Sequence, residues 1–300
     1  FRRMDAALFG EQILNGIQLG VMLFLMAAGL TLIFGIMNFL NLAHGALYMM
    51  GAFFAATVVE WTGSFLLAIP LAVIASAALG VALDLCALRP LYQRSHFDQV
   101  LGTFGLILFF NDLVNLIWGP EPHYMPIPDM LSGSAPLLGG YPIYRLVILV
   151  AGLAVAAALY VVILHTRIGM LIRAGASNRR MLSGLGVDVR VLFTGVFALS
   201  AAMAGFAGMM TAPLISVQVN MGDQVLIVAF VVIVIGGISS IAGAFVAAIL
   251  VGLVDTMGRF LLPQWLGFTV GPALASMMIY VLMAAVLYWR PQGLFSAERG

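Results

Sequence analysis

The sequence contains no lysine, because all 13 of its basic residues are arginine. A Walker A phosphate-binding loop, a Schiff base to retinal and a pyridoxal phosphate anchor each need a lysine amine, so all three are excluded. Cys86 is the single cysteine, which excludes intrachain disulfides and clustered thiolate metal sites. If this protein uses ATP, another chain must therefore bind it. The sequence also shows no nucleophile or metal-binding constellation, so we expect no catalytic residue, metal or cofactor on this chain.

Charge of either sign is also scarce. Only 8% of the 300 residues are charged, whereas 63% are hydrophobic, and the mean hydropathy is +1.12. This composition lies far outside that of soluble domains. Since backbone groups in lipid must be satisfied within the segment, and the short alternating pattern of a membrane β-barrel is absent, the sequence predicts an all-α, polytopic membrane helical bundle.

Long apolar segments recur along the whole chain, each near the roughly 20 residues that cross a bilayer as a helix. We place them at about 12–36, 41–60, 64–88, 98–118, 143–165, 190–214, 223–242, 244–262 and 270–289. This pattern predicts one transmembrane domain over 1–300 with eight or nine spans, some of them broken or re-entrant.

The arginines predict the orientation of the loops. The 166–190 loop carries five of them, so the positive-inside rule places it in the cytoplasm. The 119–142 loop has six prolines, two acids and no arginine, and we expect it to be extracytoplasmic. Counting crossings back from these loops puts the N-terminus outside, which Arg2 and Arg3 oppose, unless one segment before residue 60 is broken or re-entrant.

Polar residues interrupt an apolar run at 36–45, which reads IMNFLNLAHG. Asn38, Asn41 and His44 fall three residues apart and would share one face of a helix. One interpretation is a cytoplasmic turn in which Asn41 caps the second helix. The others are a broken helix that lines a translocation pathway, and side chains that only bond neighbouring helices.

A similar interruption occurs near the C-terminal third, where GGISSIAGAFVAA at 236–248 resembles GIMNFLNLAHGA at 35–46. Transporters often place paired broken helices around a central pathway, although chance similarity of the two stretches is an equal alternative. The candidate pathway residues are Asn38, Asn41, His44, Gly45, Gly236, Gly237, Ser239, Ser240 and Gly243.

The 166–190 loop contains the signals of a short helix at about 178–185. Ser177 or Asn178 is a good N-cap, and Gly184 or Gly186 a good C-terminal stop. One side of this helix would be apolar, formed by Met181, Leu182 and Leu185 with Arg179 and Arg180 beside it. Such a helix in the cytoplasm needs a partner surface, unless the arginines only set topology and contact lipid head groups.

Acids in or near the spans are candidate proton relays. Asp255 lies four residues before Arg259, which predicts an ion pair, and Glu60 and Asp84 lie near span ends where they can reach water. Asp112 is therefore the one candidate for a coupling acid.

Small residues at GIQLG (16–20) and AAMAGFAGMM (201–210) predict close helix packing.

Four blocks together resemble one family over nearly the whole chain. GLTLIFGIMNFLNLAHGALYMMGAF at 29–53 is similar to the N-terminal signature of branched-chain amino acid ABC transporter permeases of the LivH type. Similar blocks follow in the same order: the coupling loop and next helix at 173–210, a glycine-rich segment at 232–252, and YWRPQGLF at 288–295.

The resemblance implies an importer permease of the bacterial inner membrane, paired with a LivM-type second chain. Two cytoplasmic ATP-binding subunits would hold ATP and Mg, and a periplasmic solute-binding protein would deliver the solute; lipid is the other partner, and no nucleic acid is implied. The implied ATPase-coupling residues are Arg173, Asn178, Arg179, Arg180, Met181, Leu182, Leu185 and Gly186.

The substrate that the resemblance implies is a small amino acid, most often a branched-chain one. Permeases of the same family for urea, amides or small organic and aromatic acids are the alternative. From the residues alone, a proton-coupled secondary transporter that uses Asp112 and a passive channel also stay open.

Overall fold

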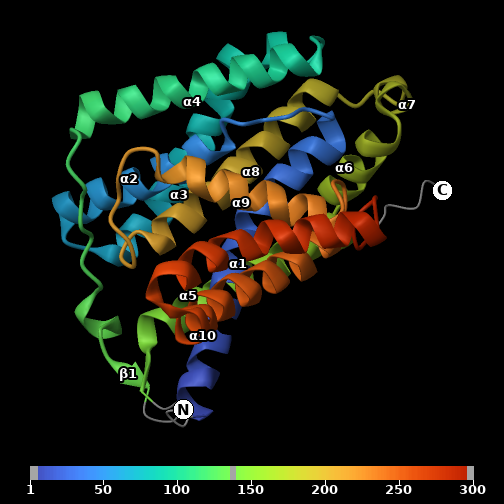
Figure 1. Ribbon diagram of the computed structural model, residues 1–300. Coiled ribbons are helices and arrows are strands. Elements are labelled where there is room, and N and C mark those ends of the chain that lie inside the picture. Colours follow the sequence, from blue (N-terminus) through green and yellow to red (C-terminus); the bar gives the residue numbers. More distant parts are fainter. Residues whose placement is uncertain (1–5, 136–139, 296–300) are drawn as a thin grey trace. The chain divides into compact units, whose positions relative to one another are not determined.

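The computed structural model describes residues 6–135 and 140–295 and shows an all-α chain (Figure 1). Ten α-helices follow one another in these residues. Their bounds are α1 Ala6–Met37, α2 His44–Thr62, α3 Phe65–Leu83, α4 His96–Trp118, α5 Ile143–His165, α6 Arg167–Ser177, α7 Arg179–Gly184, α8 Val189–Thr211, α9 Met221–Gly236 and α10 Ile241–Trp289. A π-helical turn, η1 (Asp84–Leu88), and 3₁₀ turns η2 (Arg89–Leu91) and η3 (Asp129–Leu131) complete the helical structure.

Six of the described helices are long and apolar enough to cross a membrane: α1, α3 with its extension to Leu91, α4, α5, α8 and α10. The shorter helix α9 is also apolar. The prediction of a polytopic helical membrane protein is therefore confirmed. The one described sheet is a small antiparallel pair, β1 (Ser134–Ala135) and β2 (Tyr141–Pro142), in the 119–142 segment.

Side chains at the helix starts explain most of the boundaries. Ser64, Thr166 and Ser240 each accept a hydrogen bond from the backbone N–H three residues on. Ser95 and Asp98 form a reciprocal capping box at the start of α4. Because the first N–H groups of a helix have no partner within it, such side chains determine where an apolar run becomes helical.

The sequence-based boundaries agree to a few residues, with two differences. Helix α6 falls in a stretch that we expected to be loop, and its arginines, spaced among apolar residues, give it two unlike faces. The two spans expected at 244–262 and 270–289 are halves of α10, and the chain leaves helical geometry only at Gly267, where φ is 83°. The halves fold back on each other, since Gly258 faces Met278 and Gly271 faces Pro263.

The chain divides into two compact units. Unit 1 comprises Phe1–Ala27, Ile127–Ala154 and Val228–Gly300, and unit 2 comprises Ala28–Pro126 and Val155–Ile227. In unit 1, Gly16 and Gly20 of α1 meet Leu253 and Ile249 of α10 directly. The close approach expected at GIQLG is thus confirmed, as is the ion pair of Asp255 with Arg259, at 2.9 Å.

Unit 2 is built around α2, α3 and α8, which pack against one another side by side (Figure 1). Gly51 of α2 meets the backbone of Gly205 on α8, Gly208 meets the carbonyl of Tyr48, and Gly80 of α3 meets Ala201. Each close approach uses the small residues at 201–210. In lipid such contacts hold helices together by packing, without a hydrophobic driving force between helices.

Replacing Gly51 by alanine is expected to destabilise the chain by about 1–3 kcal/mol, since overpacking a tight interior costs that much. The added methyl group would meet the backbone of Gly205, which cannot rotate away. Gly105→Ala on α4 is the matched control, because a Cβ there meets nothing within 4 Å. Thermal unfolding of the purified chain in detergent measures both, and equal midpoints for the two variants would contradict this packing.

Candidate functional site

The IMNFLNLAHG stretch is a break between two helices. Helix α1 ends at Met37 and α2 begins at His44, so that Asn38, Asn41 and His44 do not share a helix face. Asn38 is exposed and adopts a left-handed φ of 49°, which asparagine tolerates better than most residues. The expected cap by Asn41 is wrong: the N-cap is Ala43, without a side-chain bond, and Asn41 is completely buried instead.

The buried Asn41 belongs to a set of polar side chains inside unit 2. Its amide nitrogen and oxygen have no hydrogen-bond partner in residues 6–135 and 140–295, and neither do the hydroxyls of Thr31, Ser76 and Ser200. His44 is equally buried. A Cβ on Gly29 would lie 2.8 Å from Ser200 Oγ and 3.0 Å from His44 Nε2, so these two side chains are close neighbours. Unsatisfied buried polar groups are costly and are typical of functional regions.

Gly45 follows His44 in the first turn of α2. A Cβ there would lie 2.6 Å from the carbonyl oxygen of Gly222, at the start of α9. The position therefore requires glycine for packing within unit 2.

The second break lies in unit 1, between α9 and α10. Gly237 adopts a φ of 102°, and Ser240 accepts a hydrogen bond of 3.0 Å from the N–H of Gly243. Gly236 and Gly243 lie so close that a side chain on either would meet the backbone of the other. Ser239 is exposed. The N–H groups of Leu294 and Phe295 donate to the carbonyls of Ile235 and Gly236, at 2.8 and 3.2 Å.

The short helix expected at 178–185 is present as α7. Asn178 caps it by accepting a 3.0 Å hydrogen bond from the N–H of Met181, and Gly186 follows it with a φ of 84°. Met181 and Leu185 are 66% and 73% exposed, but Leu182 is only 4% exposed. The three apolar residues therefore do not form one exposed side. Met181 and Leu185 face outward, whereas Leu182 packs inside unit 2 beside Gly175.

The arginines of this segment differ in their environments. The guanidinium of Arg179 donates to the carbonyl of Ile36 at 3.0 and 2.7 Å and lies 5.2 Å from the centre of the Phe193 ring. Burial lowers the pKa of Arg179, although a guanidinium stays charged. Arg173 donates to the carbonyl of Ile163. Arg173 and Arg180 are both exposed, so of the three arginines only Arg179 is partly buried.

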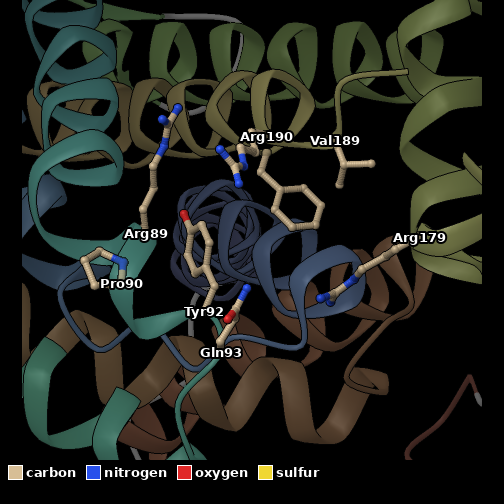
Figure 2. Close-up of a pocket in the computed structure, with 8 residues that line it drawn as sticks. Arg89, Pro90, Tyr92, Gln93, Arg179, Val189 and Arg190 are labelled. Atoms are coloured by element: carbon tan, nitrogen blue, oxygen red, sulfur yellow. The ribbon is translucent and has the colours of Figure 1, made fainter. Parts of the chain in front are cut away.

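A cavity of about 440 Å³ opens beside Arg179 in unit 2. Figure 2 shows the side chain of Tyr92 between those of Arg89 and Arg190, with Arg179 entering from the opposite side. The cavity is lined by Arg89, Pro90, Tyr92, Gln93, Arg179, Val189, Arg190 and Phe193. Its lining thus joins the η2 turn, α7 and the start of α8.

Asp84 lies next to this cavity at the start of η1 and is completely buried, which contradicts our expectation that it reaches water. Its carboxylate accepts hydrogen bonds from the hydroxyls of Tyr92 and Thr194 and lies 3.5 Å from the Nε of Arg89. Burial raises the pKa of Tyr92, and the bond to Asp84 raises it further. The phenol therefore stays protonated and donates, which ties η2 to α8.

Sequence reasoning missed the Asp84 network and the arginine-lined cavity, because their members come from segments about a hundred residues apart. One signal was available: Asp84 and Arg89 lie five residues apart at the end of one apolar run.

Asp112, the expected candidate for a coupling acid, is exposed on α4, whereas its neighbour Asn111 donates to Asp223 at 3.3 Å.

The long apolar helices of the described residues define a polytopic helical membrane protein. The family model described as "Branched-chain amino acid transport system / permease component" matches residues 12–287. The chain therefore belongs to the family of permease components of branched-chain amino acid transport systems.

Two relatives are similar to this chain over nearly their whole length. The high-affinity branched-chain amino acid transport permease LivH of Escherichia coli K12 is 26% identical over 295 residues, which cover 93% of this chain and 95% of LivH. BraD of Pseudomonas aeruginosa is 28% identical over 299 residues, 95% of this chain and 94% of BraD. The LivM permease of Escherichia coli K12 is 26% identical over 303 residues, 92% of this chain but 68% of LivM. No solved structure matches the chain.

The family resemblance read from the four sequence blocks is thus confirmed. The chain is a multi-pass membrane protein and a non-catalytic permease component of an ABC transport system, in which partner subunits bind the ATP. The sequence had left two other classes open, a proton-coupled secondary transporter and a passive channel. The family assignment argues against both.

Tyr92→Phe is expected to destabilise the chain by about 1–3 kcal/mol, because the buried carboxylate of Asp84 loses a hydrogen-bond donor. Tyr124→Phe removes the same hydroxyl from a side chain that is 83% exposed, and should leave stability unchanged. Thermal unfolding in detergent distinguishes them. A Tyr92→Phe variant as stable as Tyr124→Phe would show that the network contributes little.

Proposed function

We propose that this chain is one half of the membrane part of an ABC importer for branched-chain amino acids. The observation that carries the proposal is the match of the permease family model over residues 12–287. A LivM-type chain would form the other half, two cytoplasmic subunits would hydrolyse ATP, and a periplasmic binding protein would deliver the solute. Importers of urea, amides or small organic acids are the alternative within the same family.

The proposed path through the membrane has eight or nine crossings. Nine result when α2, α9 and both halves of α10 are counted with α1, α3, α4, α5 and α8. The arginines of 166–190 place α6 and α7 in the cytoplasm, and the proline-rich 119–142 segment would lie outside, where it would receive the binding protein.

Helix α7 is the proposed coupling helix. Met181 and Leu185 are exposed apolar side chains on a capped helix between two charged segments, and exposed apolar side chains of this kind suit a groove on a partner. Arg180 would pair with an acid at the rim. Leu182 and Arg179 have a different role in this proposal, because both bind inside unit 2 and would transmit the movement of α7 to the end of α1.

The two breaks are the residues proposed to line the translocation pathway. At the first, Asn41 and His44 supply polar groups inside an apolar bundle. At the second, Gly237 and the exposed Ser239 and Ile238 interrupt α9 and α10. Irregular backbone at membrane depth is tolerated where it lines a cavity or is buried in protein, which supports a pathway role for both.

Reconstitution of the importer tests this function. Vesicles that contain the chain, its LivM-type partner, the ATPase subunits and the binding protein are expected to accumulate leucine only when ATP is supplied, because this chain carries no ATP site. Vesicles with the chain alone should take up none. Leucine uptake by the lone chain would contradict the proposal, and ATP-driven uptake of urea instead of leucine would assign the alternative solute.

Leu185→Asp is expected to abolish association with the ATPase subunits, because it places a charge where an apolar side chain would enter the partner. Ile215→Asp makes the same change at a 47% exposed residue of the 212–220 segment, which the proposed topology places outside. Co-purification of the tagged chain with the ATPase subunits measures both. Normal assembly of the Leu185→Asp variant would show that α7 is not the coupling helix.

A further inference from the structure

Three arginines from separate segments line the cavity in unit 2. Arg89 belongs to η2, Arg179 begins α7, and Arg190 lies in the first turn of α8. Figure 2 shows Arg89 and Arg190 on one side of the cavity and Arg179 on the other. Several guanidinium groups around one cavity are suited to an anion with several oxygens, since each presents planar, forked N–H donors.

The cavity lies at the level where spans end. Arg89 is near the end of the candidate span Phe65–Leu91, and Arg190 is near the start of Val189–Thr211. The guanidinium of Arg179 binds the carbonyl of Ile36, next to the end of Leu8–Met37. Residues at such positions lie at the depth of lipid head groups, where basic pockets between spanning helices bind anionic lipids.

The charge of the cavity is only partly compensated. Arg89 pairs with the buried Asp84. Asp188 is near, but its carboxylate accepts from the N–H groups of Arg190 and Val191 as the cap of α8. Among the described residues, no carboxylate lies within salt-bridge distance of Arg179 or Arg190. The cavity therefore retains positive charge for a ligand.

Apart from Gln93, the remaining lining is mainly carbon, from Pro90, Val189 and the rings of Tyr92 and Phe193. The two rings meet edge to face with their centres 6.1 Å apart. A volume of about 440 Å³ lies within the roughly 300–1,000 Å³ of small-molecule sites. A ligand that is anionic at one end and apolar beyond it matches this lining better than a bare ion does.

We propose that this cavity binds the phosphate group of an anionic phospholipid, with Arg190 and Arg179 as its main contacts. Inorganic phosphate presents the same oxygens to the arginines and is the second possible source of the ligand. The assignment depends on neither the transported solute nor the coupling role of α7.

An acidic side chain of a partner ATPase is the rival occupant. The exposed residues of α7 that would face such a partner, Met181 and Leu185, are not part of the lining. Apart from Arg179, the lining comes from the η2 turn and the residues after it, at the end of the candidate span Phe65–Leu91, and from the start of α8. The structure therefore favours lipid over a partner side chain.

Titration of the purified full chain in detergent, followed by native mass spectrometry, tests the proposal with short-chain phosphatidylglycerol, phosphatidylcholine and inorganic phosphate as probes. The variant Arg190→Gln is expected to weaken phosphatidylglycerol binding about tenfold, as the loss of a charge-assisted contact predicts. Arg167→Gln is the matched control, because Arg167 is exposed on the same segment outside the cavity. If the glutamine variant does not fold, Arg190→Lys replaces it, with a several-fold loss expected because lysine lacks the fork.

A loss of phosphatidylglycerol binding in the Arg190 variant but not in Arg167→Gln, with weak phosphatidylcholine binding throughout, would support the lipid site. Inorganic phosphate bound as tightly as phosphatidylglycerol, and lost in the same variant, would keep the anion site but overturn lipid as its source. Equal binding by both variants would overturn the site. Unchanged lipid binding together with weaker ATPase assembly in the Arg190 variant would assign the cavity to the partner instead.

Discussion

The last carbonyl groups of a helix have no partner within that helix and must find donors elsewhere, and much of this structure follows from that constraint. Helix α1 ends beside the break at 38–43, where Asn38 bonds Phe34 and the guanidinium of Arg179 bonds Ile36. Helix α9 ends at the second break, where the N–H groups of Leu294 and Phe295 bond Ile235 and Gly236. Each interruption is closed by a segment distant in sequence.

This arrangement connects the segments that the proposed mechanism needs. Arg179 is the first residue of α7, so a displacement of α7 acts directly on the end of α1 and on the break that contains Asn41. The Asp84 network connects the other side of the same region, since Thr194 of α8 and Tyr92 after η2 bind one carboxylate. In the proposed mechanism, side-chain hydrogen bonds can therefore transmit a movement of α7 to α1 and a movement of α8 to the end of α3.

Much of the fold could be predicted because apolar run length and capping residues act locally. Helices α3 and α4 begin within a few residues of the spans predicted at 64–88 and 98–118, and Asn178 caps α7 as predicted. The side-chain environments could not be predicted in the same way. Asn41 is a good cap residue by type, yet Ala43 occupies the N-cap and Asn41 lies in the interior.

In the candidate site, too, the burial and contacts of individual side chains could not be predicted from the local sequence. That Leu182 and Arg179 bind inward, and that Asp84 is buried, depends on helices that meet only after folding. Periodicity assigns a residue to a face of its own helix, but it does not say which neighbour covers that face. The position of α7 can therefore be predicted from its caps, whereas the inward or outward direction of its residues cannot.

The facing glycines of α2 and α8 restrict how this sequence can change over time. Gly51 and Gly205 meet backbone to backbone, and Gly205 also faces Ser76. In most packed interfaces a larger residue on one helix can be accommodated by a smaller one on its neighbour. Here the neighbour is already glycine, so no second-site replacement at Gly205 can create the missing space, and the two positions are left without a compensatory route.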